Sequence, residues 1–109
     1  MKNDDFGRLI IKVTVSGCGI GLDGATVKIF DREGIQIKQS KTQENGCTSI
    51  INFQKGDVKE YRSFFDVEAE CAGYDTLVCK NVPVSYGYLS IWNMPLERQK
   101  TRENEKTRG

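Results

Sequence analysis

The chain has 109 residues, a formal net charge of +1 and no histidine. This length is typical of one domain, and the near-neutral charge offers no clustered basic face for nucleic acid. Without histidine, Ser-His-Asp and Cys-His catalysis are excluded, since both need an imidazole base. None of the four cysteines forms a C-x-x-C pair, so we expect no metal site and no cofactor.

The N-terminal residues 1–7 contain two acids and no apolar run, and we expect a flexible segment there and no signal peptide. No stretch approaches the ~18 apolar residues of a membrane span, so no membrane partner is expected. The sequence as given therefore predicts a soluble, cytoplasmic chain. Its cysteines are then expected to be free thiols, with one disulfide as the alternative. They are Cys18, Cys47, Cys71 and Cys79.

Seven short segments are rich in alternating apolar and β-branched residues, the pattern of half-buried strands. In the first two, Leu9, Ile11 and Val13 share one face, as do Val27 and Ile29. The predicted strands cover residues 8–16, 25–31, 35–42, 47–53, 63–71, 76–82 and 84–96. No segment has helical periodicity, so the pattern predicts an antiparallel sandwich.

The segments between the strands carry turn signals. The glycine-rich stretch 17–24 precedes a strand and lacks Lys-Ser/Thr, so it predicts a loop and no phosphate site. Asn45-Gly46 is a strong hairpin signal before the fourth strand. Pro83 is expected between strands or at an edge, because proline cannot donate to a ladder.

The third and the last of the predicted strands have patterns that differ from a simple half-buried strand. Segment 35–42 has Ile35 and Ile37 on its predicted inner face and is otherwise polar, which is typical of an edge strand. In the last segment Leu89 and Ile91 alternate against Trp92 and Met94, so the pattern does not fix which pair faces the core. After Leu96, residues 97–109 contain no apolar residue and eight charges, and we expect a disordered charged tail.

Several of these features, in this order, resemble the carboxypeptidase regulatory-like domain of the transthyretin-like (prealbumin-like) superfamily. The matching motifs are Gly7-Arg8-Leu9, Gly24-Ala25-Thr26-Val27, the turn from Thr42 to Gly46, Ala72-Gly73-Tyr74 and the terminal Leu96. The resemblance implies an all-β, seven-stranded antiparallel Greek-key sandwich over residues 8–96. The stretch Asn81-Val82-Pro83-Val84 further resembles accessory sandwich domains of bacterial spore-cortex and peptidoglycan-acting proteins. Members of the family usually work outside the cytoplasm, so the resemblance and the missing signal peptide point to different compartments.

Enzymes of this superfamily need residues that the chain lacks. The 5-hydroxyisourate hydrolases depend on histidines and a terminal Tyr-Arg-Gly-Ser, and intradiol dioxygenases hold iron with two histidines. Related pilin-type sandwiches carry a Lys–Asn isopeptide bond beside a buried acid. Lys12, Asn93 and Glu68 or Glu70 are the corresponding candidates, but alternation places Lys12 and both acids on polar faces.

Two groups of side chains remain as candidate sites. Asp66, Glu68 and Glu70 form an outward stripe, which is typical of a solvated strand face and not of a glycosidase cleft. Aromatic residues gather in the long loop and the last strands, and aromatic faces stack on sugars and anchor protein interfaces. The predicted binding residues are Tyr61, Phe64, Tyr86, Tyr88 and Trp92, although Trp92 and one or two of the tyrosines could instead close the ends of a small core.

We therefore expect a monomeric, non-enzymatic accessory module that docks onto a protein partner or a cell-wall glycan. The alternative is a structural or regulatory protein that associates with itself through the edge strand Ile35–Thr42. A reactive thiol at Cys18, in the glycine loop, would revive an enzymatic or redox role.

Overall fold

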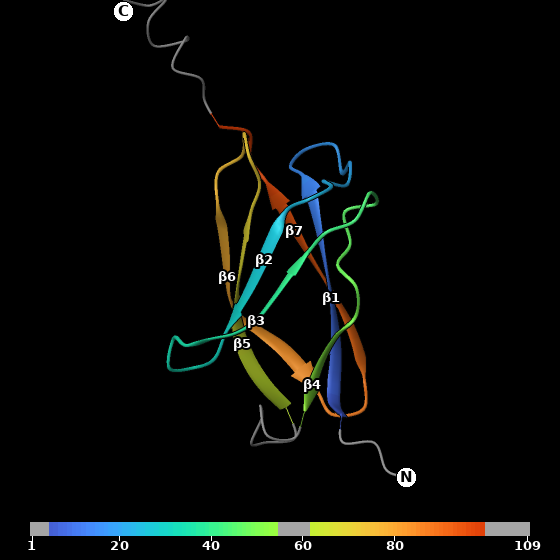
Figure 1. Ribbon diagram of the computed structural model, residues 1–109, viewed down its shortest axis with the longest axis vertical. Helices are drawn as coiled ribbons and strands as arrows, with labels where there is room; N and C mark the ends of the chain where they lie inside the picture. Colours follow the sequence, from blue (N-terminus) through green and yellow to red (C-terminus); the bar gives the residue numbers. More distant parts are fainter. Residues whose placement is uncertain (1–4, 55–61, 100–109) are drawn as a thin grey trace, which may run out of the picture.

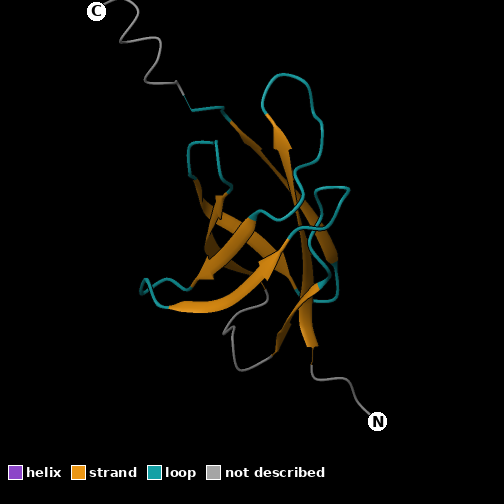
Figure 2. Cartoon of the chain, turned by 45° about the horizontal axis from the view of Figure 1, so that its top comes forward, coloured by secondary structure: helices purple, strands orange, loops and turns teal. Residues whose placement is uncertain are grey.

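The computed structural model describes residues 5–54 and 62–99, which fold into two packed β-sheets (Figure 1). Its strands are β1 (Asp5–Val15), β2 (Thr26–Phe30), β3 (Gln36–Lys41), β4 (Ile51–Gln54), β5 (Arg62–Glu70), β6 (Leu77–Ser85) and β7 (Leu89–Leu96). One sheet has the order β4-β1-β7 and the other β3-β2-β5-β6. The described residues contain seven strands and no helix (Figure 2), which confirms the prediction of an all-β sandwich.

The core lies between the two sheets and follows the predicted alternation. Leu9, Ile11 and Val13 of β1 are fully buried, as are Val27 and Ile29 of β2. Burying each such aliphatic side chain contributes about 1.5–3 kcal/mol before entropy is counted. Phe53 of β4 and Phe65 of β5 join the sheets, with ring centroids 4.7 Å apart. Period-two burial on both sheets therefore explains why these segments are strands.

The prediction of a fully antiparallel sandwich is wrong for the three-stranded sheet, because β7 runs parallel to β1. Their register extends from Arg8 opposite Leu89 to Val15 opposite Leu96. A parallel pair requires a crossover between its strands, whereas an antiparallel pair needs only a tight turn. Here the crossover consists of all the strands between β1 and β7. The last of them, β6, belongs to the four-stranded sheet, and β7 then joins the three-stranded sheet. No local pattern encodes such a pairing.

The turn at Asn45-Gly46 forms but does not close a hairpin. Gly46 N donates to the Gln43 carbonyl at 2.8 Å, and Gly46 has a φ of 85°. The strands on either side, β3 and β4, lie in different sheets, so the turn carries the chain across the sandwich. β4 consequently begins at Ile51, four residues after the predicted start of this strand.

The edge position predicted for the third strand is confirmed, since β3 is the outermost strand of its sheet. Ile35, however, lies before β3 and is 56% exposed, which corrects its predicted inward position. The pairing of β2 with β3 shifts register between Ile29 and Phe30, and this irregularity breaks the expected alternation. Ile37 does pack, half-buried, against the core.

Pro83 does not interrupt the sixth strand, which continues through it to Ser85. β6 is the outermost strand of the four-stranded sheet, so one side of its backbone has no ladder partner and tolerates proline. In β7, Met94 and Leu96 are buried while Leu89 and Ile91 are exposed, which settles the register of the last strand.

The predicted terminal segments lie partly outside the described residues. β1 already begins at Asp5, and residues 1–4 are not described. Of the predicted tail, Glu97 to Gln99 are described and residues 100–109 are not.

Candidate functional site

The five aromatic residues predicted to bind a ligand occupy separate parts of the fold. Tyr61 lies outside the described residues. Trp92 is half-buried and packs against the core, which is the structural role considered as the alternative. Phe64 is half-buried on β5, opposite Pro83. Tyr86 and Tyr88 share the turn between β6 and β7 and are exposed. Of the four predicted binding residues that the structure describes, Tyr86 and Tyr88 are the two that share one turn, and their binding role stays a prediction.

An apolar surface lies beside that turn, on the outer side of the three-stranded sheet. Because Leu9 and Ile11 point inward, Ile10 of β1 points outward, and Ile91 of β7 is its register partner. We call this surface the apolar face and define it as the outward-facing Ile10, Leu89 and Ile91 together with the exposed Tyr88 of the adjoining turn. Ile91 is 64% exposed, Tyr88 63% and Leu89 41%. The Tyr88 carbonyl accepts a hydrogen bond of 3.1 Å from Arg8 N, which fixes the turn against β1.

Sequence reasoning named Tyr88 but missed the aliphatic members of the apolar face. The ambiguous register of the last strand was the signal, since apolar residues occur on both of its faces. Such a strand buries the apolar residues of its inner face and exposes those of its outer face. Isolated exposed aliphatic residues are common, but a contiguous group marks an interaction surface.

The described charged side chains that flank the apolar face on β1 are basic. Arg8 and Lys12 point outward from β1, on either side of Ile10. Among the described outward-facing residues of β1 and β7, none is acidic. The face is therefore apolar with a basic border and complements an apolar surface that carries carboxylates.

The predicted carboxylate stripe lies on the outer face of the other sheet, along β5. Glu70 is 3.9 Å from Lys28 Nζ, and Asp66 is 3.4 Å from Lys80 Nζ. Exposed pairs of this kind contribute about 0–1 kcal/mol. The three acids lie in a row on one strand and do not face one another across a cleft, as the sequence predicts.

The isopeptide candidates are divided between the two sheets. Lys12 and Asn93 are register partners on β1 and β7, and Thr14 Oγ1 donates to Asn93 Oδ1 at 3.5 Å. Asn93 is exposed, and Glu68 and Glu70 belong to β5 in the other sheet. The Lys–Asn pair is adjacent, but it lies on the outer face of its sheet and not in the core, and the candidate acids lie on the other sheet.

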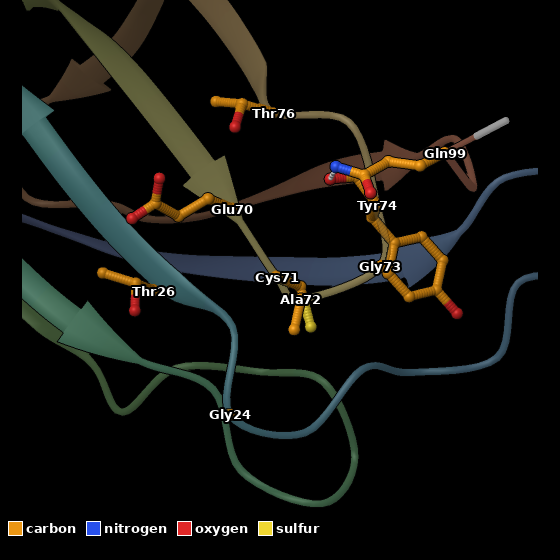
Figure 3. Close-up of a pocket in the computed structure, with 9 residues that line it drawn as sticks. All are labelled: Gly24, Thr26, Glu70, Cys71, Ala72, Gly73, Tyr74, Thr76 and Gln99. Carbon is orange, nitrogen blue, oxygen red and sulfur yellow. Dashed lines mark hydrogen bonds between the residues drawn. The ribbon is translucent and has the colours of Figure 1, made fainter. Parts of the chain in front are cut away.

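A pocket of about 350 Å³ lies at the opposite end of the sandwich from the β6–β7 turn. We call it the turn pocket. It is formed where the start of β2, the β5–β6 turn and the segment after β7 meet. Its lining residues are Gly24, Thr26, Glu70, Cys71, Ala72, Gly73, Tyr74, Thr76 and Gln99. Glu70 and Thr26 lie on one side, and Tyr74 and Gln99 on the other (Figure 3).

Backbone pairing after β7 builds one wall of the turn pocket. Gln99 N donates to the Gly73 carbonyl at 3.0 Å, and Asp75 N donates to the Glu97 carbonyl at 2.8 Å. Gln99 Nε2 donates to the Tyr74 carbonyl at 3.2 Å. The Arg98 guanidinium lies 5.7 Å from the centroid of the Tyr74 ring. The first residues of the predicted tail are thus held against the β5–β6 turn.

The remaining chemical features form no further cluster. All four cysteines are free, with Cys18 exposed and the other three half-buried. Among the described residues, no three His, Cys, Asp or Glu side chains gather in a way that would hold a metal ion. The glycine-rich loop leads into β2, as predicted. Within residues 5–54 and 62–99, no helix is long and apolar enough to cross a membrane.

Comparison with known proteins finds similarity at the level of structure alone. No protein-family model matches the chain, and a search of curated proteins finds no match. The Bacillus anthracis TIE protein superimposes with a TM-score of 0.62 at 19% identity, over 86% of this chain and 17% of that one. The minor pilin GBS52 of Streptococcus agalactiae gives 0.59 at 13% identity, over 89% of this chain and 46% of that one.

A "putative carbohydrate binding protein" of Bacteroides uniformis gives a TM-score of 0.58 at 12% identity, over 82% of this chain and 40% of that one. A 3-chlorocatechol 1,2-dioxygenase of Rhodococcus opacus also matches, with a TM-score of 0.57 at 12% identity. The chain spans less than half the length of the first three proteins. At these identities the likeness shows the fold, which is consistent with a transthyretin-like sandwich.

Proposed function

We propose that this chain is a non-catalytic binding module that docks onto a protein partner through the apolar face. The observation that carries the proposal is the exposure of Leu89 and Ile91 on the outer face of a sheet whose other face packs into the core, with exposed Tyr88 in the adjoining turn. Aromatic and aliphatic side chains in the centre of an interface contribute most of its binding energy. The pilin and carbohydrate-binding names among similar structures support a binding role over a catalytic one.

The chemistry of the face favours a protein over a cell-wall glycan as its occupant. Ile10, Leu89 and Ile91 offer no hydrogen-bonding side-chain atoms, whereas a polysaccharide presents hydroxyl groups that need partners. The partner surface that fits is apolar at its centre and acidic at its rim, opposite Arg8 and Lys12.

An enzymatic role finds no support in the residues. The sequence has no histidine, so the iron ligands of an intradiol dioxygenase and the imidazole of a hydrolase are missing. The carboxylates of β5 lie along one strand beside lysines. The dioxygenase among the similar structures therefore shares the fold with this chain and not the site.

The test is affinity capture from an extract of the organism that encodes the chain, using matched variants. Ile91→Asp places a carboxylate in the apolar face. Val78→Asp is the control, because Val78 is also β-branched, exposed and on an outermost strand, but faces outward from the other sheet. The proposal expects a protein that is retained by the wild type and by Val78→Asp, and lost with Ile91→Asp. Retention of the same protein by the wild type, Val78→Asp and Ile91→Asp alike would contradict the proposal.

Two measurements on the purified protein separate the alternatives. A monomer by light scattering at micromolar concentration agrees with docking, whereas a dimer would favour self-association through the edge strand β3. Co-sedimentation with insoluble peptidoglycan that Ile91→Asp abolishes would replace the protein partner with a cell-wall glycan.

A further inference from the structure

The turn pocket is a separate concave feature of the fold, which the proposed docking role does not use. Its volume of about 350 Å³ is at the lower end of the range for small-molecule sites, which suits a mono- or disaccharide. The surface inside it is mostly polar, so a purely apolar ligand would leave polar groups without partners.

The side chains around the turn pocket offer hydrogen bonds in both directions. Thr26 and Thr76 each bring a hydroxyl, which both donates and accepts, and Glu70 brings acceptor oxygens. The Gln99 Nε2 group is held by the Tyr74 carbonyl, which directs the amide. Its Oε1 atom remains an acceptor. This mixture matches a ligand that carries several hydroxyl groups.

The charge of Glu70 and the aromatic ring of Tyr74 further restrict the class of ligand that fits the turn pocket. The one charged side chain that lines the turn pocket, Glu70, has Lys28 Nζ 3.9 Å away, so the pair carries no net charge. The paired Glu70 carboxylate gives a cation no unbalanced negative charge, and its oxygens would repel an anion, so a neutral ligand fits it best. Tyr74 lies across the pocket from Glu70 (Figure 3), and the Arg98 guanidinium beside its ring helps to hold it. Aromatic side chains provide an apolar surface with a polar tip.

We propose that the turn pocket binds a neutral saccharide, with Glu70, Thr76 and Gln99 as hydrogen-bonding residues and Tyr74 as an aromatic wall. Cys71 and Ala72 form the part of the wall between the two sides (Figure 3). The site is shallow and lies between turns, so binding is weak and in fast exchange.

The test is a titration of the isotope-labelled full chain with glucose, galactose, mannose, xylose, N-acetylglucosamine and chitobiose, one at a time, followed by amide chemical shifts. For at least one of these sugars, the proposal expects saturable shifts centred on residues 24–26, 70–76 and 97–99. Absence of saturable shifts with all six sugars would overturn the proposal. So would shifts centred on the apolar face, which would instead make that face the glycan site.

A pair of variants tests the role of the side chain. Gln99→Ala keeps the backbone bond to Gly73 and removes the amide, and we expect affinity for the responding sugar to fall about tenfold. Gln43→Ala is the control, because Gln43 is also an exposed glutamine whose Nε2 makes one hydrogen bond, here to Ser49 Oγ at 3.2 Å. Equal affinities in the two variants would refute the assignment of Gln99. The amide spectrum of each variant shows whether the fold is intact.

Discussion

Thr42 follows β3 directly, and the hydrogen bonds of its side-chain hydroxyl hold the loop before β2 against the end of β3. The residue is 4% exposed. Its Oγ1 accepts a hydrogen bond of 2.9 Å from Ala25 N and donates one to the Leu22 carbonyl. Thr42→Val keeps the shape of the side chain and removes both bonds. It leaves a buried N–H and a partly buried carbonyl without these partners.

The loss of stability in Thr42→Val is estimated from these two groups, the Ala25 N–H and the Leu22 carbonyl. A buried polar group left unsatisfied costs about 1–3 kcal/mol, so we expect Thr42→Val to lower the free energy of unfolding by about 2–3 kcal/mol. In a domain of this size each kcal/mol lowers Tm by about 4–8 °C, so the loss in Tm is about 8–24 °C. Thr42→Ser keeps the hydroxyl and removes one methyl group, which costs about 0.8 kcal/mol.

Urea unfolding followed by tryptophan fluorescence measures both variants, since the chain has one tryptophan. The prediction is that the valine variant is less stable than the serine variant by more than about 1 kcal/mol, from the two estimates above. If the serine variant is the less stable of the two, methyl packing rather than hydrogen bonding holds this loop, and the reasoning fails.

Two further predictions concern the backbone and a covalent bond. Gly46→Ala is expected to destabilise the fold more than Gly34→Ala does. Both glycines have a φ of 85°, so the backbone strain of an alanine is similar at the two positions. A Cβ at Gly46 would lie 2.6 Å from the Val13 carbonyl oxygen, whereas a Cβ at Gly34 would enter open space. Equal losses of Tm in the two variants would show that the close approach is unimportant. For Lys12 and Asn93, intact-mass spectrometry is expected to give the full sequence mass, because both lie on the outer face of their sheet and the candidate acids Glu68 and Glu70 lie on the other sheet. Loss of one ammonia would show that the isopeptide bond forms.

The parts of the fold that the sequence predicts are those encoded by local pattern. Leu9, Ile11 and Val13 alternate with polar neighbours, and period-two burial is enough to make that segment a strand with a known inner face. The turn at Asn45-Gly46 likewise depends on the positive φ that its glycine adopts without strain. Both features are decided within a few residues of chain.

The features that the sequence does not reveal depend on pairing between distant segments. Leu89 opposite Arg8 in a parallel register is a contact between the last strand and the first, and no local signal specifies it. Only this pairing decides that Met94 faces the core and Ile91 faces water. The apolar face could therefore not be predicted as a site.

The turn pocket was missed for a related reason. Its walls come from the start of β2, the β5–β6 turn and the segment after β7. Tyr74 was identified only as part of a family motif, and Gln99 only as part of a polar tail. Their proximity results from the hydrogen bonds between residues 73–75 and 97–99.

The docking role of the apolar face is tested most directly by chemical-shift mapping with the protein that affinity capture identifies. Labelled wild-type chain is titrated with that purified partner, and Ile91→Asp is titrated in parallel. We expect shifts centred on residues 8–12 and 86–93 in the wild type, and none in the variant at the same partner concentration. Shifts centred instead on the outer face of the four-stranded sheet, or unchanged in the variant, would contradict the docking role.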